Sequence, residues 1–217
     1  MFANLILAQN DFVITPKPKI KKISFSIVPH YVLFHGLRFD YEYQNDKKAY
    51  VFAPQFYYLS RGMHPISFSQ ADLYKLLGAG LQIHRKFIRK TSYNNTGYIA
   101  IGAGYNFFYS KFREYLPSAT ELYGNEVWVY SVQKLTGAVH RFEINGTIGI
   151  QDNLPTGLMV EGYLGIGYRY SMPFFSRPIQ NPFDRAMDFA YTGPIFIVGA
   201  KFGFSKFYNS QAPVQTF

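Results

Sequence analysis

The sequence predicts an all-β fold, an eight-stranded antiparallel up-and-down barrel that spans a membrane. Three observations support this fold class: apolar and polar residues alternate in segment after segment, the segments are even in number, and their connections alternate in length. Alternation with a period of two places every second side chain on the same face of a strand. A membrane barrel has this pattern because its outer face meets lipid while its inner face encloses a narrow, polar lumen.

The alternation is clearest in residues 157–171. One face of this segment is aliphatic and is formed by Leu158, Val160, Leu164 and Ile166. The opposite face combines glycines with the charged residues Glu161 and Arg169. A soluble core is not normally packed in this way, so we expect the aliphatic face to contact hydrocarbon and the charged face to be enclosed.

Seven further segments of the chain alternate in the same way. In chain order, the eight predicted strands are residues 23–33, 37–43, 49–60, 73–88, 98–112, 137–151, 157–171 and 194–207. Most of them have about 10 to 15 residues, which suits a tilted span of a bilayer.

The connections between these segments alternate between short and long after a tight first reversal at residues 34–36. The short turns, near residues 45–48, 93–97 and 152–156, are rich in Asn, Asp and Gly or Pro, which are typical turn residues. The long connections are residues 61–72, 113–136 and 172–193, and residues 127–132 predict a hairpin that rises beyond the membrane. Short turns at one end and long loops at the other are typical of barrels whose termini are both periplasmic.

Composition narrows the class further. Tyr and Phe, 19 and 22 residues respectively, favour strands and interfacial belts. No window contains the roughly 18–20 consecutive apolar residues that a helical span needs, and the absence of cysteine excludes disulfides and thiolate metal sites. The net charge of +9 indicates anionic surroundings such as lipid phosphates, lipopolysaccharide or nucleic acid. Nucleic acid is disfavoured, because the aromatic residues alternate onto a lipid-facing side.

Four regions follow from these patterns. Residues 1–8 are interpreted as the remnant of a signal peptide, because an apolar stretch ends there at a small residue. Residues 9–22 are expected to form an extended, basic segment. Residues 23–207 are expected to form the barrel, and residues 208–217 a polar tail.

Over residues 23–207 the chain resembles the small eight-stranded outer-membrane barrels of Gram-negative bacteria, the group that includes the outer-membrane protein A and X barrels. The last strand resembles the signal that the barrel-assembly machinery recognises, with Gly199, Phe202 and Phe204 at its glycine and hydrophobic positions. Ile197 stands where that signal usually has a polar residue. The resemblance implies a location in the cell outer membrane, insertion by that machinery, and contact with outer-membrane lipid.

Charged residues of both signs are predicted to face the lumen. This predicted network comprises Arg38, Asp40, Glu42, Arg141, Glu143, Glu161, Arg169 and Lys201. Burial of such groups requires pairing, so we expect an ion-pair network that plugs the lumen. A narrow pore or a small-ligand site is the alternative.

The long loops predict two kinds of surface. The first is aromatic and is expected either to bind a protein partner or to fold over the barrel mouth; its residues are Trp128, Phe174, Phe175, Phe183 and Phe189. The second is basic and is expected to bind lipopolysaccharide phosphates, or else to anchor the barrel among anionic headgroups; its residues are Arg61, Lys111, Arg113, Arg177 and Arg185.

The expected function is a non-catalytic structural or accessory role, as a subunit of an envelope protein complex contacted through the long extracellular loops. No nucleophile stands beside a histidine at a strand end, and the five histidines lack metal spacing, so we predict no catalytic residue, metal or cofactor. The alternative is a narrow channel, or a barrel that binds a small ligand or lipopolysaccharide. A soluble lipocalin-like barrel is a third class, and it would place its apolar side inward.

Overall fold

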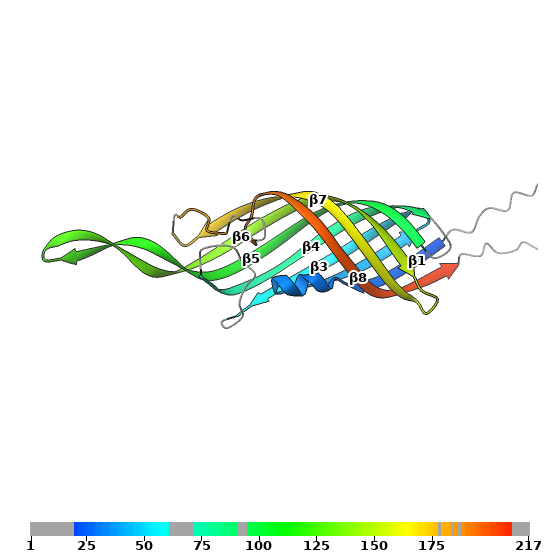
Figure 1. The fold of residues 1–217 in the computed structure, drawn as a ribbon, viewed down its shortest axis with the longest axis horizontal. Helices are drawn as coiled ribbons and strands as arrows, with labels where there is room; N and C mark the ends of the chain where they lie inside the picture. Colours follow the sequence, from blue (N-terminus) through cyan, green and yellow to red (C-terminus); the bar gives the residue numbers. More distant parts are fainter. Residues whose placement is uncertain are drawn as a thin grey trace, which may run out of the picture.

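The strands pair in sequence order and close into a ring. In the computed structural model they are β1 (Ile20–Ile27), β2 (Gly36–Asn45), β3 (Lys48–Leu59), β4 (Asp72–Lys90), β5 (Asn95–Leu122), β6 (Asn125–Asn153), β7 (Leu158–Phe175) and β8 (Gly193–Asn209). A 3₁₀ helix, η1 (Pro29–Phe34), joins β1 to β2. Every neighbouring pair is antiparallel, and β8 pairs back with β1. The predicted eight-stranded up-and-down barrel is therefore confirmed (Figure 1).

The structure describes residues 20–60, 72–90, 95–177, 179–183, 185 and 188–209. The expected signal remnant, most of the basic segment, Arg61 and the end of the polar tail lie outside these ranges. Within them, no helix is both long and apolar enough to cross a bilayer.

The two faces of the barrel wall differ as the alternation predicts. On β7, Leu164 and Ile166 are 58% and 65% exposed on the outside, whereas Glu161 is 1% exposed on the inside. The other strands repeat this arrangement, so the outer surface of the closed ring is apolar. Hydrocarbon accounts for such a surface, because monomeric soluble proteins rarely expose contiguous apolar patches larger than a few hundred Å².

The two ends of the barrel are different. β1 begins beside the end of β8, where Ile20 pairs with Asn209, and the turns after β2, β4 and β6 lie at this terminal end. At the opposite end β5 and β6 continue past the ring. Pairing of β5 with β4 stops at Arg113, and pairing of β6 with β7 begins at Gly137. Residues 114–136 therefore form a two-stranded ribbon, which Figure 1 shows projecting far beyond the barrel. The hairpin predicted around residues 127–132 is therefore present, and it is an uninterrupted extension of β5 and β6.

The first strand differs from its expected boundaries. β1 begins at Ile20, so Lys22 belongs to the wall and not to the extended basic segment, and β8 likewise runs on to Asn209. β1 also ends at Ile27, because Pro29 stands at the start of the η1 turn and lacks the N–H that a strand would use. His35 then ends η1 in the left-handed conformation, with φ at 53°.

Glycines on the inner face of the wall make room for large neighbours. A Cβ atom at Gly78 would lie 2.6 Å from the ring of Phe108, and one at Gly102 would lie 2.3 Å from the ring of His84. Both pairs are direct cross-strand partners between β4 and β5. The small residues thus allow a narrow lumen to hold bulky ones.

Candidate functional site

The centre of the lumen holds Glu161, which binds two lysines. Lys86 Nζ lies 2.7 Å from one carboxylate oxygen of Glu161, and Lys201 Nζ lies 2.8 Å from the other. Lys86 also lies 2.5 Å from Glu42, and Lys22 lies 3.3 Å from Glu42 on its other side. These residues are almost completely buried, so the ion pairs replace the water that would otherwise solvate each charge.

A second branch of the network runs through Asp40. Lys201 Nζ lies 2.9 Å from Asp40, and Arg38 donates to both oxygens of Asp40, at 2.6 and 3.1 Å. Such a two-bond contact suits the planar guanidinium. Arg38 also donates to Gln82 at 2.7 Å, and Gln82 in turn donates to Glu143 at 3.1 Å. The network thereby reaches the fourth lumen carboxylate without interruption.

Glu143 completes the network on the β6 side. Arg169 donates to it from Nε at 2.9 Å, and Asn145 donates at 3.2 Å. Each of the four carboxylates in the network therefore has a cationic partner. This geometry suits a closed plug better than acid–base catalysis, since opening it would leave buried charges unpaired. Among the described residues, no group of His, Asp and Glu side chains is placed to hold a metal ion.

Arg141 is the one predicted network residue that lies apart. It is 5% exposed and makes no ion pair with any described carboxylate. Its guanidinium lies 4.7 Å above the ring of Phe108, and it donates to the Phe189 carbonyl at 3.3 Å and to the Tyr57 hydroxyl at 3.4 Å. Its Nε atom is buried without a hydrogen-bond partner. Arg141 is therefore a buried cation with hydrogen-bonding capacity to spare.

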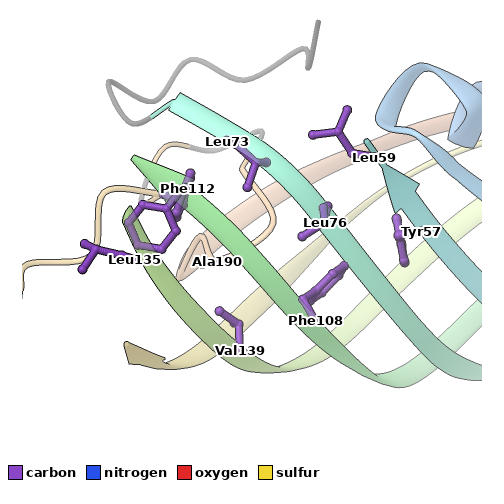
Figure 2. Packing of buried hydrophobic residues seen from close by; sticks show 10 residues of the cluster. Tyr57, Leu59, Leu73, Leu76, Phe108, Phe112, Leu135, Val139 and Ala190 are labelled. Atoms are coloured by element: carbon purple, nitrogen blue, oxygen red, sulfur yellow. The ribbon is translucent and has the colours of Figure 1, made fainter. Parts of the chain in front are cut away.

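Apolar side chains close the lumen at the ribbon end. Figure 2 shows this cap, whose strand residues come from β3, β4, β5 and β6 and are Tyr57, Leu59, Leu73, Leu76, Phe108, Phe112, Leu135 and Val139. The connection between β7 and β8 adds Phe183 and Ala190, both fully buried. This loop therefore folds into the mouth, where it shields the network from water.

We expect Phe183→Ala to loosen the cap while leaving the barrel closed. Phe183 packs against Phe112 and Phe189, with ring centroids 4.9 and 4.7 Å apart, and Phe-to-Ala changes in cores cost about 3–5 kcal/mol. Tryptic cleavage after Arg185, in the same loop, should become at least about tenfold faster, since tenfold corresponds to only about 1.4 kcal/mol. Phe174→Ala, at an exposed position next to the loop, is the control. Equal cleavage rates in the two variants would show that Phe183 does not hold the loop.

A cavity of about 560 Å³ lies between the cap and the network. Its lining is apolar on the cap side and polar on the network side. The apolar part includes Leu59, Leu73, Leu76, Phe108 and Phe189; the polar part includes Arg38, Gln82, His84, Arg141, Glu143 and Arg169. Small-molecule sites typically occupy about 300–1,000 Å³ and combine apolar walls with a few polar groups.

The five predicted partner-binding aromatics occupy three environments. Trp128 on the ribbon and Phe174 at the end of β7 are 67% and 60% exposed. Phe175 and Phe189 pack partly buried against the cap, and Phe183 lies within it. Two roles were expected for this set, binding a partner or folding over the mouth. Phe175, Phe183 and Phe189 lie at the mouth, and Trp128 and Phe174 are the two that are exposed to a partner.

The predicted lipopolysaccharide-binding residues that the structure describes lie near the base of the ribbon or in the β7–β8 loop. Arg113 is 3.4 Å from Asp72 and stacks over Tyr74, while Arg185 is exposed. Lys111 pairs with Thr136, which is hydrogen-bonded to Ser176. Arg177 is the next residue after Ser176, and it donates a hydrogen bond to the side chain of Gln133 on the ribbon. Arg61 lies outside the described residues.

Several lumen residues were absent from the predicted network. Lys22 was assigned to the basic segment, although its alternation with Ser24 and Ser26 places it on the inner face. Lys86 was predicted from the alternation to face inward but was not included in the network, and it carries two of the ion pairs. Tyr98, which donates to Glu161 at 2.5 Å, and Gln82 are neutral, so a search for charged residues does not find them.

A closed ring of eight strands, an apolar exterior and a charge-paired interior define the class of small transmembrane β-barrels. No protein-family model matches this chain, and no curated protein matches it. Among solved structures, the chain is similar to the crystal structure of Acinetobacter baumannii CarO2, with 12% sequence identity over 89% of this chain and 100% of that one, at a TM-score of 0.41. Membership of the outer-membrane protein A and X group stays a prediction.

Proposed function

We propose that this chain is an integral outer-membrane barrel with a non-catalytic, accessory role, and that its ribbon contacts another envelope protein. The observation that carries the proposal is an aromatic stripe on the ribbon. The stripe is formed by Tyr115, Trp128, Tyr130 and Val132, which are 70%, 67%, 73% and 51% exposed. The cross-strand pairs are Tyr115 with Val132, Pro117 with Tyr130, and Ala119 with Trp128, so these side chains share one face.

The stripe has the properties of an interface. Tyr and Trp dominate protein contacts, because they bury large areas with few rotatable bonds. A two-stranded ribbon is marginally stable alone in water, and neither of its outer edges pairs with a described strand, so both can accept an added strand. A partner seated on the stripe would stabilise the ribbon and cover its apolar surface.

The rest of the proposal follows the same orientation. The terminal end faces the periplasm, and the ribbon faces outward, as the short and long connections predict. The barrel-assembly machinery inserts the chain, with the Phe202 and Phe204 strand as its signal. The basic residues near the ribbon end (Lys111, Arg113, Arg177 and Arg185) contact lipopolysaccharide phosphates.

Site-specific photo-crosslinking in intact cells tests the ribbon contact. With benzoylphenylalanine at Tyr130, on the stripe, we expect one discrete protein adduct. Trp128→Ser should reduce its yield about fivefold or more, because a truncated interface aromatic typically costs over 1 kcal/mol. The same probe at Val129, on the opposite face of the ribbon, is the matched control. Equal yields from both positions, or adducts only with lipopolysaccharide, would refute the protein contact.

The cavity favours a second candidate function, a barrel that binds a small ligand. Its volume and its mixed lining fit that role. A conducting channel is less well supported, because the ion pairs around Glu161 fill the lumen below the cavity.

A further inference from the structure

The barrel wall is incomplete between β8 and β2. β1 ends at Ile27, which pairs with Phe202 of β8 and with Phe39 of β2. Residues 193–201 of β8 therefore pair with β7 on one side and with no described strand on the other. Only residues 36–38 of β2 stand opposite, and they pair with β3. The strand ladder is thus interrupted over this part of the wall.

The helix η1 occupies the gap without forming a strand ladder. The N–H of Val28 bonds to the Arg38 carbonyl at 3.1 Å, which fixes the start of η1 to β2. On the β8 side, His30 packs where Gly199 leaves room, since a Cβ there would lie 2.3 Å from the His30 ring. In Figure 1 the helix lies near β8, and the two are in contact. Contacts of this kind are easier to open than a hydrogen-bonded strand pair.

The cavity reaches this gap. Its lining includes Leu33 of η1 and Phe196 and Val198 of β8, which are 59%, 93% and 76% exposed on the outer surface. Phe196 pairs with Ile166, and Val198 pairs with Leu164. Phe196 and Val198 therefore lie at the same depth in the membrane as these lipid-facing residues of β7. Backbone without a strand partner at membrane depth is tolerated only where it is buried in protein or lines a water-filled cavity. Here residues of η1 and of β8 line the cavity together, so the cavity reaches the lipid-facing side of the wall between them.

The charge of the lumen indicates what the cavity accepts. Five buried cations, Lys22, Arg38, Lys86, Arg141 and Lys201, and the partly buried Arg169 share the lumen with the network carboxylates Asp40, Glu42, Glu143 and Glu161. A fifth buried carboxylate, Asp188, lies in the connection between β7 and β8 and also lines the cavity. Arg141 forms no ion pair with any described carboxylate, and it lines the cavity beside apolar walls. A ligand with one anionic group and an apolar body complements both features.

We propose that the barrel takes up lipophilic carboxylates from the surrounding bilayer, through the opening between η1 and β8, and binds the carboxylate on Arg141. The apolar body of the ligand then lies against Phe108 and the leucines below the cap. This inference rests on the cavity and the interrupted strand ladder, and it is independent of the ribbon contact.

Fluorescence binding of pyrenebutyrate to the protein in lipid nanodiscs tests the ligand class. We expect saturable binding of pyrenebutyrate and at least tenfold weaker binding of pyrenebutanol, which has the same apolar body without the charge. Arg141→Gln should weaken pyrenebutyrate binding about 10- to 100-fold and leave pyrenebutanol unchanged, as expected for a charge-assisted hydrogen bond. Equal affinities of the two probes for the unaltered protein would overturn the proposal, whether or not Arg141→Gln folds.

The route is tested by blocking the seam. The chain has no cysteine, so Val198→Cys can be modified alone with a bulky methanethiosulfonate and restored with dithiothreitol. Modification should slow pyrenebutyrate uptake at least tenfold, and reduction should restore it. Ile101→Cys, on the lipid face of β5 and likewise exposed, is the control and should have no effect. The lateral route would be excluded if modification of Val198→Cys left the uptake rate unchanged. It would also be excluded if modification of Ile101→Cys slowed uptake to the same extent.

Discussion

Glu161→Ala is expected to destabilise the barrel strongly. The substitution leaves Lys86 and Lys201 buried with one carboxylate fewer each, and it removes the acceptor of the Tyr98 hydroxyl. Breaking a buried ion pair from one side costs about 3–5 kcal/mol. In a chain of this size that cost corresponds to roughly 6–20 °C in the unfolding midpoint. The measurement is the temperature at which the folded electrophoretic band converts to the unfolded one in detergent.

The matched control is Glu126→Ala, which removes the same side chain from an exposed site on the ribbon. It should leave the midpoint within about 2 °C, because surface substitutions typically change stability by less than 0.5 kcal/mol. A midpoint for Glu161→Ala as high as that of Glu126→Ala would mean that the central ion pairs contribute nothing to stability.

Gly203→Val is expected to prevent closure of the barrel. Gly203 pairs with Ser26 across the seam between β8 and β1. A Cβ atom there would lie 2.1 Å from the Phe25 carbonyl oxygen and 2.6 Å from the Ser26 Cα, so the obstacle is backbone, which cannot rotate away. Only eight residue pairs join β1 to β8, and Gly203 stands next to the last of them, so displacing the strands there disrupts the short ladder that closes the ring. The folded electrophoretic band, which converts to the unfolded one only on heating, should therefore be lost.

The same substitution at Gly162, in β7, separates a steric effect from a general effect of replacing glycine. A Cβ atom at Gly162 would meet nothing within 4 Å, so Gly162→Val should give the normal folded band. If Gly203→Val also gave that band at the unaltered conversion temperature, the close approach of β1 to β8 at this point would not be essential.

The faces of the strands could be predicted because side-chain alternation is a local property. Any residue two positions from Leu164 in β7 shares its face wherever that strand lies, so the lipid-facing and lumen-facing residues of each strand followed from that strand's own alternation. The same rule places Lys22 inside the barrel once β1 is known to begin at Ile20. That boundary was missed because a lysine- and proline-rich stretch precedes it.

The contacts within the lumen could not be predicted in this way. Lys86 and Glu161 are 75 positions apart in the chain, and Arg38 and Gln82 are 44 apart. Which of them meet depends on strand stagger around the closed ring, and no local pattern carries that information. The isolation of Arg141 from the carboxylates has the same origin.

The sequence by itself determined the class of barrel, its strand number, the alternation of its connections, and which side of each strand meets lipid, because a period of two and the chemistry of turns are written in neighbouring residues. Only the tertiary structure decided that Phe183 and Ala190 enter the mouth, that η1 replaces the end of β1, and that the cavity reaches Val198. Each of these depends on the fit between segments brought together by closure of the ring.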